Sequence, residues 1–127
     1  MHVSVEMSAE AEAVVLARDI AARAAGSLAA AEQRLEDLRL LTSEIVTNAL
    51  RHAGLKAGDS IALAVEASAD RVRVEVADPG PGFDPNLLAE PMAERVGGWG
   101  LFLVKKLADR WGVERNHLNR VWFELSL

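Results

Sequence analysis

The feature that most limits the folds open to this chain is a change in the spacing of its apolar residues near Gly58. Before that point, alanine and leucine recur three or four residues apart, which is the spacing of a helix. Alanine is the best helix former, and glycine commonly ends a helix. We therefore expect one helix over residues 8–25, stopping near Gly26, and a second over residues 29–52.

Beyond these helices the apolar residues alternate with polar or small ones, which is the period of a half-buried strand. The pattern predicts strands over residues 61–65 and 72–76, joined as a hairpin by residues 67–70. The same alternation predicts a last strand over residues 121–125 and a short first strand over residues 2–6.

The stretch between the hairpin and the last strand divides into a loop and a helix. Residues 78–98 are dense in glycine and proline, so we expect a loop, with a helical turn near residues 87–94. The spacing of the apolar residues over 98–111 predicts a third helix, with Trp111 on its apolar stripe. Strands that neighbour one another in pairs favour an α+β sandwich of two layers, formed as one domain by residues 1–127.

The composition excludes several classes of protein. A net charge of −5 disfavours a broad nucleic-acid surface. The chain has no cysteine, which excludes disulfides and thiol catalysis, and its three histidines are too scattered for a zinc site. No apolar run approaches the roughly 20 residues that span a bilayer. The first residues lack a signal-peptide pattern, so we expect a cytoplasmic protein without membrane contact.

Three segments are candidates for chemistry, and the first lies in the second helix. Glu44, Asn48 and His52 are each four residues apart and therefore share one helix face. That face borders the apolar stripe, so its polar groups can line a pocket between helix and sheet. Taken alone, the segment fits a solvated flank of an amphipathic helix better.

The second segment, Asp78-Pro79-Gly80-Pro81-Gly82, directly follows a predicted strand. Its glycines allow a ligand to approach the backbone closely, and an aspartate at the end of a strand can accept a hydrogen bond from a base. Taken alone, proline and glycine at these positions indicate a tight turn.

The third segment, Gly97-Gly98-Trp99-Gly100, opens the third helix. Such an entry exposes backbone N–H groups where the helix dipole favours phosphate. The chain has no GxxxxGK[ST] motif, which excludes a P-loop, and no GxGxxG between a strand and a helix, which disfavours a Rossmann site.

Together, the order and spacing of these segments resemble the GHKL superfamily (gyrase, heat-shock chaperone, histidine kinase and mismatch-repair ATPase). The likeness covers about residues 30–127 and is carried by SEIVTNALRHAG, VADPGPGFDP and GGWGLFLVKKLADRWGV, closed by RVWFEL. The most similar branch is that of the small bacterial anti-sigma-factor kinases. The resemblance implies a Bergerat-type sandwich, with a mixed, mainly antiparallel sheet and helices on one face.

The resemblance also implies roles for individual residues. Asn48 matches the ligand of the Mg²⁺ that bridges the ATP phosphates, and Glu44 matches the general base. Asp78 matches the acceptor of the adenine amino group. The matching glycines are Gly80 and Gly82 beside the nucleotide, and Gly98 and Gly100 beside the phosphates.

One residue and one loop depart from the pattern of the family. A threonine that helps to hold adenine through water is absent before the last strand, where Asn119 is the candidate replacement. The loop over residues 83–97 is also shorter than the ATP lid of histidine kinases, which supports the compact regulatory branch.

Three functions follow from the resemblance. The first is an anti-sigma factor that phosphorylates a serine or threonine of an antagonist protein and alternately sequesters a sigma factor, commonly as a homodimer. The second is a non-catalytic ATP-binding module whose loop at residues 83–97 gates a partner surface. A third and weaker interpretation is a detached histidine-kinase catalytic domain. His52 is a poor candidate for the phosphoacceptor of such a kinase, because it lies inside the expected ATP helix.

Overall fold

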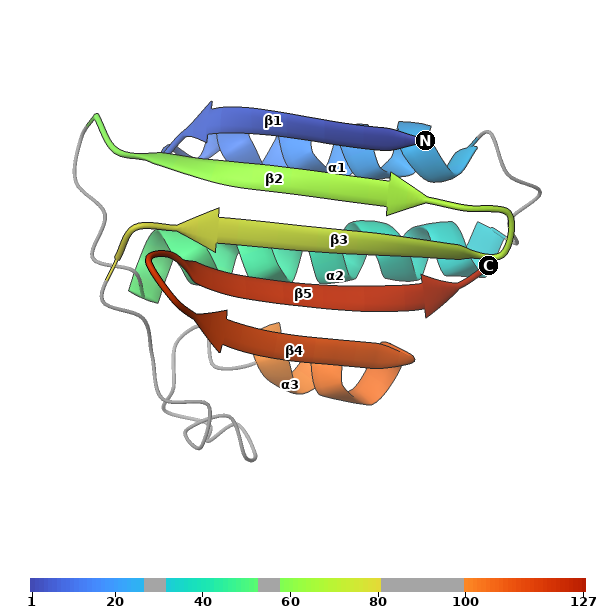
Figure 1. The fold of residues 1–127 in the computed structure, drawn as a ribbon. Coiled ribbons are helices and arrows are strands. Elements are labelled where there is room, and N and C mark those ends of the chain that lie inside the picture. Colours follow the sequence, from blue (N-terminus) through green and yellow to red (C-terminus); the bar gives the residue numbers. More distant parts are fainter. Residues whose placement is uncertain (27–31, 53–57, 81–99) are drawn as a thin grey trace.

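The computed structural model describes residues 1–26, 32–52, 58–80 and 100–127 of the chain (Figure 1). These residues form a five-stranded sheet with three helices packed on one of its faces. In chain order the elements are β1 (His2–Ser8), α1 (Glu12–Gly26), α2 (Glu32–His52), β2 (Ser60–Ala67), β3 (Arg71–Asp78), α3 (Gly100–Leu107), β4 (Arg110–Arg115) and β5 (Asn119–Ser126).

The strands lie in the order β1-β2-β3-β5-β4. Every pairing between them is antiparallel. This confirms the predicted α+β sandwich with helices on one face, although the expected sheet was mixed and the described one has no parallel pair. The predicted hairpin is also present, since the Ser68 N–H donates to the Arg71 carbonyl at 2.8 Å.

The core lies between α2 and the inner face of the sheet. Alternate residues of each strand point to the same face, so the alternation seen in the sequence separates an apolar side from a polar one. Each fully buried aliphatic side chain stabilises the fold by roughly 1.5–3 kcal/mol. The largest fully buried side chains include Phe123, Leu38, Leu41, Ile45, Ile61, Leu63 and Leu125.

Helix α1 approaches its neighbours through small side chains. A stripe of buried alanines runs along one side of it: Ala13, Ala17, Ala21, Ala24 and Ala25. Residues three and four apart lie on one face of a helix, so this stripe is continuous. Alanine projects only a methyl group, which brings α1 close to α2 and to the strands that they cover together.

The third helix was predicted too long, and no range was predicted for β4. The Ala108 N–H still donates to the Val104 carbonyl at 2.9 Å, whereas the next one, of Asp109, donates to Glu124 of β5 at 3.0 Å. Helix α3 therefore ends at Leu107, and Trp111 lies in β4 opposite Phe123. Pairing with the edge of β5 outweighs the helical spacing of these apolar residues. The turn predicted near residues 87–94 lies outside the described residues.

Both ends of the chain are attached beside the β2–β3 hairpin. The amino group of Met1 donates to the Ala67 carbonyl at 2.7 Å. The Leu127 N–H donates to the Asp70 carbonyl at 2.9 Å. Figure 1 shows both termini at the end of the sheet opposite the one where β3 finishes. In the described part of the chain, no helix is long and apolar enough to cross a membrane.

Candidate functional site

Two of the three predicted site segments lie at one edge of the sandwich, together with the start of β5. Helix α2 packs against β3 and β5, and its C-terminal end lies near the end of β3 and the start of β5 (Figure 1). Along β3 the inward positions are Val72, Val74 and Val76, and the next position of this parity is Asp78. Alternation therefore turns the Asp78 carboxylate toward the helices rather than toward solvent.

Asn119 occupies the matching inward position at the start of β5 and pairs with Asp78 in the strand register. Both residues are buried, with exposed fractions of 4% and 5%. The Asn119 amide nitrogen donates to Oδ1 of Asp78 at 3.2 Å and also to the Gly80 carbonyl. The Gly80 N–H donates to the same Oδ1 at 2.8 Å. The strand therefore ends in a buried carboxylate that is held by two donors.

Asn48 in α2 is buried, with 9% of its surface exposed. Its amide nitrogen has no hydrogen-bond partner among the described residues. Buried polar groups are nearly always paired, and this NH₂ group is a donor, so its missing partner would be a hydrogen-bond acceptor such as an oxygen of a bound ligand. An amide oxygen is also a suitable ligand for Mg²⁺, which prefers oxygen and few protein ligands.

Glu44 lies one helical turn before Asn48 and is half-buried. Burial raises the pKa of its carboxyl group, and the positive charge of Arg51, further along the same helix, partly opposes that shift. A carboxylate with a raised pKa is a better proton acceptor than an exposed one, which suits a general base. The predicted pair of Glu44 and Asn48 thus lies on one partly buried face.

The glycines of the predicted site are only partly described. Gly80 is half-buried and contacts Asp78 as given above, and Gly100 is the first residue of α3. Gly82 and Gly98 lie outside the described residues, as does the loop over residues 83–97. The phosphate end of the predicted site therefore stays a prediction.

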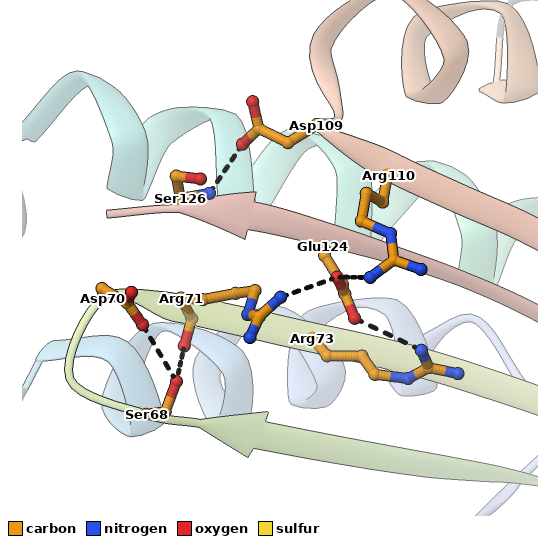
Figure 2. Close-up of polar contacts among 8 residues, drawn as sticks. All are labelled: Ser68, Asp70, Arg71, Arg73, Asp109, Arg110, Glu124 and Ser126. Carbon is orange, nitrogen blue, oxygen red and sulfur yellow. Dashed lines mark hydrogen bonds and ion pairs between the residues drawn. The ribbon is translucent and has the colours of Figure 1, made fainter.

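A second polar cluster lies on the opposite, open face of the sheet, and the sequence patterns did not predict it. Glu124 is only 7% exposed, because arginines from neighbouring strands cover it. Figure 2 shows the guanidinium groups of Arg71, Arg73 and Arg110 converging on its carboxylate, at distances of 3.4 to 3.6 Å. The outward parity of Arg71 and Arg73 was visible, but their common partner depends on strand register.

This cluster borders a shallow hollow of about 570 Å³. Its charged groups already pair with one another, so it is an ion-pair network on the surface of the sheet. Within the described ranges, no group of three histidine, aspartate or glutamate side chains is arranged to hold a metal ion. The edge at Asp78 and Asn48 is therefore the better candidate for a ligand site.

The fold and this edge define a class of protein: an α+β sandwich with a buried carboxylate and amide between its sheet and the longest of its described helices. The family described as "Histidine kinase-like ATPase domain" matches residues 7–125 of the chain. The protein belongs to this family.

Relatives and a solved structure agree with the family. The chain is 33% identical over 127 residues to the serine-protein kinase RsbW of Listeria monocytogenes, covering 86% of this chain and 78% of that protein. It is 30% identical over 120 residues to RsbW of Staphylococcus epidermidis, covering 85% and 76%.

A crystal structure of the RsbU and RsbW domains of Rv1364c from Mycobacterium tuberculosis has the same fold, with a TM-score of 0.73 at 17% identity. The match covers 98% of this chain but 32% of that longer one. The present fold therefore corresponds to about a third of that protein.

Proposed function

We propose that this protein binds ATP with Mg²⁺ and is an anti-sigma factor with serine/threonine kinase activity. Its substrate would be a hydroxyl group of an antagonist protein, and its second partner would be a sigma factor. The names of the relatives support the kinase class, since both are serine-protein kinases. The proposal includes action in the cytoplasm and assembly as a homodimer.

The observation that carries the proposal is the buried Asp78 carboxylate on the helix-facing side of β3, at the edge where Asn48 has an orphaned amide. A buried carboxylate oxygen selects a donor, and the exocyclic amino group of adenine is one. A guanine base offers a carbonyl oxygen at that position, which a carboxylate repels. Asp78 therefore supports a preference for ATP over GTP.

Asn48 is the residue that would ligate Mg²⁺ through its amide oxygen. When bound, Mg²⁺ neutralises charge on the phosphate oxygens during transfer. The amide nitrogen, which the described residues leave unpaired, is a donor and would pair with an acceptor such as a phosphate oxygen. Gly98 and Gly100 are the proposed backbone contacts to the phosphates, with Gly80 and Gly82 beside the nucleotide.

Glu44 is the proposed catalytic base. As the acceptor hydroxyl oxygen bonds to the transferred phosphorus and ADP leaves, the Glu44 carboxylate takes the proton of that hydroxyl. Its raised pKa favours this transfer. Phosphoryl transfer depends mainly on positioning and electrostatics, which a small site of this type can supply.

Calorimetry of Mg-ATP and Mg-GTP binding to the wild type, Asp78→Asn and Asn48→Ala tests the site. We expect binding selective for ATP that both changes weaken, whereas absent or unselective binding would overturn the proposal. Glu44→Gln then separates kinase from non-catalytic module: binding kept with transfer to the antagonist lost supports catalysis. If the wild type binds ATP but transfers no phosphate to the antagonist, the protein is a gating module.

A further inference from the structure

The hydrogen bond from Asn119 to Asp78 fixes the carboxylate that would recognise a base. We propose that Asn119 is a positioning residue that orients the Asp78 carboxylate, so that the site selects a purine nucleotide with an amino group at position 6. The inference rests on the proposed nucleotide site and assigns its selectivity to a second residue, at the start of β5.

The orientation of the Asn119 amide follows from its partners. The two groups that it faces, Oδ1 of Asp78 and the carbonyl of Gly80, are both acceptors. Only the NH₂ end of an amide can satisfy two acceptors, and it carries two hydrogens. Both hydrogens are therefore used, and Asn119 connects the carboxylate to the backbone of the turn that follows β3.

The same contacts restrict the carboxylate. Oδ1 accepts from the Asn119 amide and from the Gly80 N–H, so rotation of the side chain would break two hydrogen bonds in a buried setting. An unmade hydrogen bond at a buried group costs more than a made one contributes. The rotation is therefore disfavoured, and Oδ2 is the carboxylate oxygen that these two donors leave for a base.

A comparison with other side chains explains why asparagine suits position 119. A threonine hydroxyl has one hydrogen and can donate to the carboxylate or to the Gly80 carbonyl, but not to both. An aspartate would bring a second negative charge against Asp78. Register places residue 119 directly opposite residue 78, so a short side chain reaches both acceptors.

The experiment compares binding of Mg-ATP with that of Mg-purine riboside triphosphate, which has hydrogen in place of the 6-amino group. Calorimetry on the wild type, Asn119→Ala and Asn119→Thr gives the ratio of the two affinities. We expect the wild type to prefer ATP by about tenfold, the effect of one well-placed hydrogen bond. Asn119→Ala should reduce the ratio to near one, and Asn119→Thr should give an intermediate value.

A merely structural role would weaken both ligands equally and leave the ratio unchanged, which would overturn the inference. Asn116→Ala is the matched control, because Asn116 is an exposed asparagine in the same turn before β5. Asn119→Thr keeps one donor and serves if the alanine variant does not fold. A wild type that binds neither nucleotide overturns the proposed function and this inference together. A selective wild type with an equally selective Asn119→Ala overturns the inference alone.

Discussion

Replacement of Gly112 by alanine should destabilise the protein, because the ring of Trp122 covers this glycine. The two residues are paired across β4 and β5. A Cβ atom at Gly112 would lie 2.5 Å from Nε1 of Trp122 and 2.6 Å from Cε2. Contacts between such atoms are normally roughly 3.5 Å or more, so the indole must move by about 1 Å.

The free energy has three contributions. Overpacking of this kind costs about 1–3 kcal/mol. Arg73 stacks on the indole, 4.0 Å from its centroid, and losing that contact costs about 0.5–1 kcal/mol. Against this, alanine restricts the unfolded chain more than glycine does, which contributes about 0.4–1 kcal/mol of stability. Gly112 does not have a positive φ, so alanine can adopt its backbone conformation. We expect a net loss of about 2 kcal/mol.

Urea unfolding followed by circular dichroism measures the effect, and a second background supplies the control. In Trp122→Leu the indole is absent, so Gly112→Ala should no longer clash. There it should be neutral or stabilising by about 0.5 kcal/mol. A reversal of sign between the two backgrounds is the expected result. Equal destabilisation in both, or none in the wild type, would show that the ring does not rest on this glycine.

Three further results are expected. Burial raises the pKa of Glu44, so the folded protein binds this proton more tightly than the unfolded chain does. Its contribution to stability is complete at acid pH and declines as the pH rises above 4.5, its ordinary value, through the raised pKa. The melting temperature of Glu44→Gln relative to wild type should therefore increase with pH, and a flat difference would refute the assignment. Glu124→Gln leaves three guanidinium groups without their shared carboxylate and should cost about 1–2 kcal/mol in urea unfolding, less at high salt. An effect that does not depend on salt would contradict this account. Leu41→Ala should cost about 2–5 kcal/mol, because Leu41 is fully buried in the core. A loss below 1 kcal/mol, by the same measurement, would mean that the side chain is not packed there.

The parts of the fold that could be predicted depend on local spacing. Helix α2 and strands β2 and β3 follow from the periods of their own apolar residues, because each buries one face. Strand β4 could not be found in this way. Val104, Ala108 and Trp111 have helical spacing, and only the free edge of β5 determines that the chain leaves the helix at Leu107.

The residues of the candidate site divide in the same way, into those that local spacing predicts and those that strand register brings together. The shared face of Glu44 and Asn48 follows from their separation by four residues, and the inward direction of Asp78 follows from the parity of β3. The contact of Asn119 with Asp78 joins residues far apart in the chain and depends on the register of β3 with β5. The convergence of three arginines on Glu124 depends on register as well, and local patterns carry no information about it.

The attachment of both chain ends beside the β2–β3 hairpin affects how this protein can be joined to other molecules. Met1 donates a hydrogen bond to Ala67, and Leu127 donates one to Asp70, at the opposite end of the sheet from Asp78. A linker, tag or neighbouring domain fused at either terminus therefore starts at the far end of the sandwich. Protein tethered to a sensor surface through such a fusion would direct the Asp78 edge into the flowing solution, where nucleotides and partner proteins can reach it.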